Sequence, residues 1–195
     1  MPSKFVLRSF VENGYYHVFD RGNNKQTIFR EIEDYFYFLK LLHYYLSEPG
    51  ETLRVNFYQD ICVLTYCLLP NHFHLMIKQT KERSISKFMQ VILQRYTHYH
   101  NKKYAHVGHV FQGKYGARLL EDNNDLLNTS RYVHQNALDI GEDVLTYRFS
   151  SSQYYLNTMA HPQWLNTQIL KDVMEGYFGV KKGGFETHYR RYLLD

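Results

Sequence analysis

The stretch ICVLTYCLLPNHFHLMI, residues 61–77, decides the fold of this 195-residue chain. It contains two apolar runs, 61–69 and 72–77, which are separated by Pro70 and Asn71. β-Branched and aromatic residues favour strands, whereas proline and asparagine interrupt strands and favour turns. The stretch therefore predicts two antiparallel strands joined as a hairpin.

The segments on either side of this hairpin alternate between strand and helix patterns. Residues 15–19 are β-branched and aromatic and lead into turn residues at 21–24, which predicts a first strand. Residues 28–46 predict a helix, because their first turn is acidic and Pro49-Gly50 stops them. A further strand is expected over 53–58. In 84–102, apolar residues recur at three- and four-residue steps, which predicts a second helix.

The remaining elements complete a known topology. A Gly- and His-rich loop at 106–109 precedes a short strand through 118–120, and a helix capped by Asn123-Asn124-Asp125 is expected to reach about Leu138. The order β-α-β-β-α-β-α is that of a split-βαβ sheet. We therefore predict an α+β fold, a ferredoxin-like antiparallel sheet with helices on one face plus a C-terminal extension.

The expected domain organisation is simple, since domains usually contain roughly 100–200 residues. Residues 1–155 are expected to form the main domain. Residues 156–195 are expected to form a basic accessory segment, with a final helix from Phe185. Their role is not visible in the sequence.

Composition excludes two classes of protein. The chain is 44% hydrophobic and 17% aromatic, which excludes a disordered protein. Because no apolar run approaches the ~18 residues that cross a bilayer, we expect no membrane span. Cys62 and Cys67 are five residues apart and would lie on opposite faces of a strand, so they are not expected to pair. With no signal-peptide pattern at the N-terminus, a cytoplasmic location is expected.

The charge is mildly basic, with 23 Lys and Arg against 19 Asp and Glu and a formal net charge of +4. Basic residues cluster in four places: Lys102-Lys103, Lys114 with Arg118, Lys181-Lys182 and Arg190-Arg191. Phosphate binding depends on such local clusters more than on the net charge. Surface charge is common, however, so the clusters alone do not identify a nucleic-acid-binding protein.

His72 and His74 are the sharpest local feature of the sequence. Residues two apart on a strand share a face, and their Cα atoms lie roughly 6.6 Å apart, a span that lets two imidazoles converge on one cation. Phe73 then points to the opposite face, into the core. Paired histidines on a strand are more often ordinary surface or cross-strand residues. If they bind a metal, an open site with an added oxygen ligand fits better than a closed zinc site, which needs four ligands.

The predicted third helix offers such an oxygen. Tyr132 and Asn136 are four residues apart and share one helical face, so a phenol and an amide oxygen could reach the same centre. The alternative is that Tyr132 packs in the core and Asn136 caps the helix or faces water. With 19 tyrosines in the chain, composition does not single out Tyr132.

Five blocks of sequence, in order along the chain, resemble those of one protein family. They are YHVFDRGNN at 16–24, YCLLPNHFHL at 66–75, VGHVFQGKY at 107–115, RYVHQN at 131–136 and FSSSQY at 149–154. The family is that of the single-tyrosine HUH transposases, and among them the REP-associated tyrosine transposases. The resemblance covers about residues 8–155, and the ordered set is far more specific than any single block.

The resemblance implies a ferredoxin-like fold and metal-dependent cleavage of single-stranded DNA, often at a hairpin-bearing element. It implies that His72 and His74 hold Mg²⁺ or Mn²⁺, that Tyr132 is the nucleophile and that Asn136 completes the metal site. Gln135 remains a rival for the third ligand. The chain departs from the family pattern at Ala137, where proline is common, and at Phe149, where tryptophan is common, but neither change removes a catalytic group.

The implied reaction is an attack by the Tyr132 hydroxyl on a phosphodiester, which releases a 3′ hydroxyl and leaves a 5′ phosphotyrosine. A phenol is a weak nucleophile near neutral pH because its pKa in model peptides is about 10, so a divalent cation at the phosphate would assist. The group that accepts the phenol proton is open between His134 and water. Tyr96 and Tyr99, on the second helix, are rival nucleophiles.

The expected partner is single-stranded or hairpin DNA, with the protein in the cytoplasm and associated with the nucleoid when bound. A monomer and a homodimer that shares its tyrosine helix are both compatible with the sequence. Two alternative functions are a DNA- or RNA-binding regulator that no longer cuts and a metal-dependent hydrolase that uses water. The residues expected to bind DNA lie in or beside the family-like loops: Arg21, Asn23, Lys114, Tyr115 and Arg118, with Phe111 as a second aromatic that could stack on a base.

Overall fold

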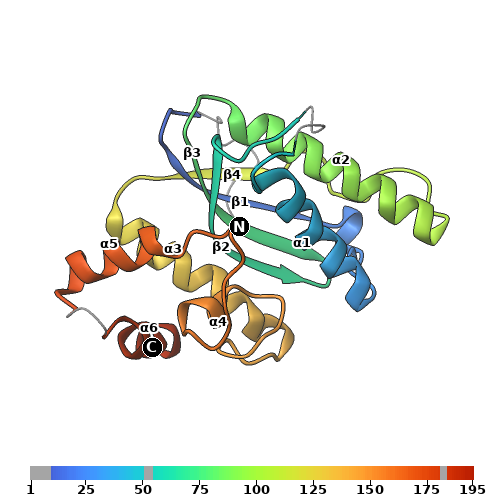
Figure 1. The fold of residues 1–195 in the computed structure, drawn as a ribbon. Coiled ribbons are helices and arrows are strands. Elements are labelled where there is room, and N and C mark those ends of the chain that lie inside the picture. The colour runs from blue at the N-terminus through green and yellow to red at the C-terminus, as the bar shows by residue number, and fades with distance from the viewer. Residues whose placement is uncertain (1–9, 51–54, 181–183) are drawn as a thin grey trace.

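The computed structural model describes residues 10–50, 55–180 and 184–195. Its centre is a four-stranded antiparallel sheet with the strand order β2-β3-β1-β4 (Figure 1). The strands are β1 (Tyr15–Arg21), β2 (Ile61–Leu69), β3 (His72–Gln79) and β4 (Gly116–Leu120). The first strand lies inside the sheet between β3 and β4, as in a ferredoxin-like fold, so the α+β prediction is confirmed.

The hairpin predicted from residues 61–77 is present. β2 and β3 pair antiparallel from Leu69 opposite His72, with a register shift between Val63 and Thr65. The Pro70 carbonyl in the turn accepts hydrogen bonds from the backbone amides of Ile28 and Phe29. These bonds attach the hairpin turn to the segment that leads into the first helix.

Two helices, α1 (Ile32–Leu46) and α2 (Ser84–Tyr104), cover one face of the sheet (Figure 1). The core beneath them is rich in aromatic rings. Phe38 of α1, for example, contacts Phe73 of β3 with ring centroids 5.2 Å apart. Apolar area of this kind is the main source of folding free energy.

The first helix starts later than the sequence predicts, at Ile32 in place of residue 28. Glu31 and Asp34 form a capping box that begins the helix there. Ile28 and Phe29 lie before this cap, where their amides bond to the Pro70 carbonyl and their side chains are buried in the core.

The third helix, α3 (Asn123–Gln135), lies on the opposite face, against β2 and β3 (Figure 1). Asp122 caps it by accepting a hydrogen bond from the Asp125 amide. The chain then tightens into a 3₁₀ turn, Asn136–Ile140, so the single helix expected as far as Leu138 is divided in two. The two helices of the ferredoxin-like unit thus share one face of the sheet, and the added helix covers the other.

The strand expected over 53–58 does not form within the described residues 55–58, and residues 53 and 54 lie outside the described part of the chain. The Asn56 side chain donates to the Ser47 carbonyl and accepts from the Tyr58 amide. Such local hydrogen bonds compete with the ladder of a sheet. The segment is therefore a turn before β2.

The C-terminal segment packs on the α3 side of the molecule. It contains α4 (Ser152–Tyr155), α5 (Gln168–Phe178) and α6 (Phe185–Leu194), the last of which starts at the predicted residue. These helices share a second core with α3 and the sheet, to which Met76, Leu127, Tyr155, Met174 and Tyr189 belong. In the part of the chain that the structure describes, no helix is long and apolar enough to span a membrane.

Candidate functional site

The alternation of β3 places His72 and His74 on the face toward α3, and Phe73 on the face toward α1. The rings of His72 and His74 are 5.0 Å apart between centroids. Tyr132 of α3 lies next to them, with its ring 5.5 Å from that of His74. The structure thus brings together three side chains that are distant in sequence but were predicted to share a site.

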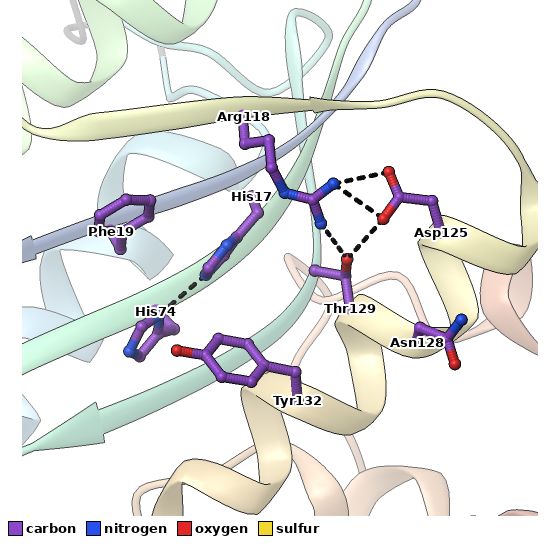
Figure 2. A pocket seen from close by; sticks show the side chains of 8 residues that line it. All are labelled: His17, Phe19, His74, Arg118, Asp125, Asn128, Thr129 and Tyr132. Carbon is purple, nitrogen blue, oxygen red and sulfur yellow. Dashed lines mark hydrogen bonds and ion pairs between the residues drawn. The ribbon is translucent and has the colours of Figure 1, made fainter. Parts of the chain in front are cut away.

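Tyr132 is accessible to solvent, with 52% of its surface exposed. Its ring is nearly perpendicular to the rings of both His17 and His74, at interplanar angles of 81° and 84°. Figure 2 shows its hydroxyl directed toward His74. An exposed phenol beside buried imidazoles can meet a substrate from solution without any rearrangement of the core.

His74 has one ring nitrogen bonded and one open. Its Nδ1 is 2.8 Å from Nε2 of His17 (Figure 2). Its buried Nε2 has no hydrogen-bond partner among the described residues. An unpaired buried polar atom costs roughly 1–3 kcal/mol. Burial lowers the pKa of His74 well below its usual value, so its imidazole is neutral at neutral pH and has one ring nitrogen with a lone pair, as a metal ligand requires.

The bond to His17 can hold His74 in the tautomer that a metal requires. If Nε2 of His74 is the ligand, the ring proton resides on Nδ1, which then donates to His17. His17 must therefore be a neutral acceptor. Burial and, to a lesser extent, the charge of Arg118 lower the pKa of His17 to about 4, so this condition is met at neutral pH.

Asn71 has the same relation to His72 that His17 has to His74, a hydrogen bond to the ring Nδ1. Nδ1 of His72 donates to the Asn71 side-chain oxygen at 2.7 Å, which leaves Nε2 of His72 as the nitrogen with the lone pair. Burial lowers the pKa of His72, while nearby Asp139 and Asn136 act in the opposite direction. Both histidines thus have Nδ1 in a hydrogen bond with a neighbour, an arrangement typical of metal ligands.

The geometry favours Asn136 over Gln135 as the third ligand. Asn136 lies beside His72, and its Nδ2 donates to the Tyr132 carbonyl at 2.6 Å, which leaves its oxygen free of that bond. Gln135 instead donates to the Leu193 carbonyl of α6 at 2.9 Å. In residues 10–50, 55–180 and 184–195, no three His, Cys, Asp or Glu side chains gather to hold a metal. A cation here would need amide and phosphate oxygens besides the histidines.

A pocket of about 350 Å³ opens between the sheet and α3. It is lined by His17, Phe19, His74, Arg118, Asp125, Asn128, Thr129 and Tyr132 (Figure 2). The mouth is polar on the α3 side and histidine-rich on the sheet side. Its size is in the range of small-ligand sites, enough for one nucleotide unit beside the Tyr132 hydroxyl.

Arg118, expected to bind DNA, lines this pocket but is already engaged. Its Nη1 bonds to both carboxylate oxygens of Asp125, at 2.9 and 2.8 Å, and its Nη2 donates to Thr129 at 2.7 Å. These bonds join β4 to α3 and leave two of the five guanidinium N–H groups for a ligand. The carboxylate of Asp125 offsets part of the positive charge.

The other residues expected to bind DNA are placed differently. Lys114 is exposed. Arg21 donates from its Nε to Gln112 and lies opposite His72 in the β1–β3 pairing. Asn23 is half-buried, and its amide bonds to the Val110 carbonyl.

The two aromatics expected to stack on bases are core residues in this structure. Tyr115 is only 7% exposed, and Phe111 packs between Phe73 and Tyr96 on the α1–α2 side of the sheet. Neither ring has an open face for a base. Their apolar environment, which a single sequence does not reveal, overrides the loop position that suggested a binding role.

The rival nucleophiles lie on the wrong side of the sheet. Tyr96 is fully buried and donates to the Ile28 carbonyl at 2.7 Å, and Tyr99 donates to Asp34 at 2.9 Å. Burial raises the pKa of Tyr96 far above its usual value. Neither hydroxyl is therefore poised to attack a substrate at the histidine face.

His134 is not available as a base for Tyr132. It is fully buried, with Nε2 2.8 Å from the Ser151 hydroxyl and Nδ1 2.9 Å from the Tyr189 hydroxyl. Burial lowers its pKa to about 3. Its two bonds attach α3 to the 151 turn and to α6, so its role in this structure is to position the helix.

Sequence reasoning missed His17, Phe19, Asn128 and Thr129 as parts of the pocket. A signal for His17 exists, because it is the polar residue between buried Tyr16 and Val18 in β1. Alternation places it on the opposite face from those two. Which strand lies beside that face, however, is decided only by the pairing of β1 with β3.

Comparisons with known proteins identify a family and similar solved structures. The family model described as IS200-like transposase matches residues 10–136. A solved structure of a REP-associated tyrosine transposase bound to a REP hairpin is similar, with a TM-score of 0.60 and 12% identity, covering 84% of this chain and 92% of that chain. A putative transposase from Deinococcus radiodurans R1 has a TM-score of 0.43 and 12% identity, covering 71% and 98%. No curated protein matches the chain.

Proposed function

Because this chain belongs to the IS200-like transposase family, we propose that it cleaves and rejoins single-stranded DNA through a covalent tyrosine intermediate. The observation that carries the proposal is the meeting of Tyr132 with His74 at one open pocket, with the Nε2 atom of His74 buried and unpaired among the described residues. An apolar or hydrogen-bonded residue would be expected at that position if it served stability alone.

The proposed cofactor is a divalent cation, Mg²⁺ or Mn²⁺ as the family resemblance implies. Nε2 of His72, Nε2 of His74 and the side-chain oxygen of Asn136 would hold it. The cation would neutralise charge on the scissile phosphate and polarise its phosphorus. Asn71 and His17 hold the two imidazoles in the required tautomers, as their hydrogen bonds indicate.

Tyr132 carries the chemical step. Its oxygen forms a bond to phosphorus, the bond from phosphorus to the 3′ oxygen breaks, and that oxygen leaves as a 3′ hydroxyl after gaining a proton. The phenol proton goes to water, since Tyr132 is exposed and His134 is buried with both nitrogens in use. The phosphotyrosine preserves the phosphodiester linkage, so attack by another 3′ hydroxyl rejoins strands without ATP.

Hairpin-bearing single-stranded DNA is the proposed substrate. The similar solved structure is a complex with a REP hairpin, and that protein shares the fold. In this chain, the loop that contains exposed Lys114 bonds to Arg21 and Asn23 through Gln112 and Val110. Arg21 is the last residue of β1 and pairs with His72 of β3. In this structure all proposed catalytic side chains come from one chain.

The test is an assay for a protein–DNA adduct that survives denaturation, with labelled hairpin-bearing single-stranded DNA and Mn²⁺. Wild-type protein and Tyr44→Phe, which changes an exposed tyrosine on α1, should form the adduct. Tyr132→Phe should lose it, and Tyr96→Phe should retain it.

An adduct that persists in Tyr132→Phe would contradict the assignment of the nucleophile. Cleavage without an adduct would favour a hydrolase that uses water. Hairpin binding with neither cleavage nor adduct would favour a regulatory DNA-binding protein on this scaffold.

A further inference from the structure

One wall of the pocket is bonded to the C-terminal helix α6. Asn128, which lines the pocket, accepts a hydrogen bond of 3.0 Å from the Tyr192 hydroxyl of α6. The Arg131 guanidinium lies over the Tyr192 ring, 4.7 Å from its centroid. Tyr192 therefore contacts α3 at two residues, Asn128 and Arg131, and Asn128 is one helical turn from Tyr132.

A second aromatic ring extends this surface away from the pocket. Phe178, at the end of α5, has its ring centroid 5.9 Å from that of Tyr192 and 5.0 Å from that of His188. It is 42% exposed, and its neighbour Tyr177 is also exposed. We call Arg131, Tyr192, Phe178 and His188 the C-terminal track.

Folding does not explain the exposure of Phe178, whereas Tyr192 packs against the edge of the second core. α6 is already anchored by Phe185, Tyr189 and Leu193, which are buried in the second core. Exposed neighbouring aromatics on a protein surface often mark a binding site. The track therefore has a free aromatic face that the fold itself does not need.

The charge around the track suits a phosphate backbone. Arg190 and Arg191 of α6 are exposed, and Arg131 is half-buried. Within the described ranges, none of these three arginines forms an ion pair. Glu186, the acidic residue in the first turn of α6, is bonded to Asn157. Aromatic rings interleaved with unpaired cations are the usual platform for single-stranded nucleic acid.

We propose that the C-terminal track binds the unpaired nucleotides that continue from the cleavage position. Bases stack on Phe178 and Tyr192, and phosphates contact Arg131 and Arg191. The inference rests on the proposed function, since it takes the pocket as the place of cleavage. Apart from Arg131, it adds a substrate-binding surface outside the matched family region, which ends at residue 136.

The test compares binding of two DNAs by full-length protein that carries Tyr132→Phe, so that no adduct forms. Both contain the same hairpin, but the unpaired flank has about ten nucleotides in one DNA and about two in the other. Single-strand-binding surfaces of this kind cover about 4–16 nucleotides, so only the longer flank can fill the track. Fluorescence anisotropy gives the Kd of each. The protein with an unaltered track should bind the long-flank DNA more tightly than the short-flank DNA.

Phe178→Ala should weaken binding of the long-flank DNA about 5- to 100-fold, the range for loss of one base–aromatic stack, and leave the short-flank DNA within about twofold. Phe178→Trp should restore the affinity, because tryptophan also stacks. Arg131→Gln should lower the salt dependence of long-flank binding by about 0.7 in log Kd per log salt. Tyr44→Ala changes an exposed tyrosine on the other side of the sheet and is the control; it should change the affinity for neither DNA.

Equal affinities of Phe178→Ala and the control for the long-flank DNA would overturn the inference, as would equal weakening on both DNAs. The adduct assay with unaltered Tyr132 separates this result from the proposed function. Adduct formation without a flank effect refutes the track and leaves cleavage intact. A flank effect without any adduct refutes cleavage and supports the track as a DNA contact.

Discussion

Two buried polar side chains on opposite faces of the central sheet, Asp34 and His74, differ in their hydrogen bonding. On the α1–α2 face, Asp34 is fully buried and accepts hydrogen bonds from the amides of Arg30 and Glu31 and from the side chains of Tyr99, Lys103 and Tyr104. On the α3 face, the buried Nε2 of His74 has no partner among the described residues.

The difference separates a buried charge that is fully hydrogen-bonded from a buried nitrogen that is open to a ligand. A buried charge is tolerated when it is fully hydrogen-bonded, as Asp34 is. An open buried nitrogen is a cost in folding that a bound cation can offset. The same strand, β3, contributes Phe73 to the first face and His74 to the second.

The largest effects are expected from substitutions of the adjacent residues Phe73 and His74, which lie on opposite faces of the sheet. Phe73→Ala should cost about 3–5 kcal/mol of unfolding free energy, because it removes a buried ring that contacts Phe38 and Phe111. His74→Ala should change stability by about 1 kcal/mol or less but abolish adduct formation. Urea unfolding and the adduct assay measure the two effects. Equal losses of stability in both variants would contradict the contrast between the faces.

A smaller effect is expected from Asp34→Asn, on the order of 3 kcal/mol at pH 7, since it removes a buried acceptor of five hydrogen bonds. Burial opposes the charged form of Asp34, but bonds from Lys103, Tyr104, the Glu31 amide and Tyr99 lower its pKa to about 2. A folded pKa below the unfolded value means that this stability is present above the unfolded pKa, near 4, and is lost as the pH falls toward 2.

The difference between wild type and Asp34→Asn should therefore shrink between pH 4 and pH 2, as measured by urea unfolding. The variant should still form the adduct at neutral pH while it is folded, because Asp34 lies on the opposite face from Tyr132. A difference that stays constant down to pH 2 would show that the charge of Asp34 does not stabilise this face.

The smallest expected effect sharpens the comparison within the α3 face. His17→Phe should weaken Mn²⁺ binding about 10- to 100-fold, the usual cost of losing a partner that orients a metal ligand. Calorimetric titration of Mn²⁺ without DNA measures this directly. His17→Gln, whose side-chain oxygen can accept from His74, should recover part of the affinity. Tyr16→Phe, the neighbouring residue on the opposite face, should leave Mn²⁺ affinity unchanged, and unchanged affinity in His17→Phe would exclude a positioning role.

Much of the fold could be predicted from local patterns. The apolar runs around Pro70-Asn71 predict the hairpin, and the three- and four-residue steps of 84–102 predict α2. The patterns failed where distant contacts decide the outcome. α1 begins at Ile32, after the Glu31–Asp34 capping box, while Ile28 and Phe29 bond to the distant Pro70 carbonyl. Tyr115 and Phe111 lie in a loop but are buried against the sheet and α2.

By itself, the sequence determined the order of the elements and which residues share a face, because both follow from the periods of strands and helices. His72 lies on the side of His74, and Tyr132 lies one turn from Asn136, for that reason. Only the tertiary structure decided that α3 packs on the histidine face and that His17, brought in by the β1–β3 pairing, bonds to His74. These arrangements depend on contacts between residues 57 or more positions apart, which no local pattern encodes.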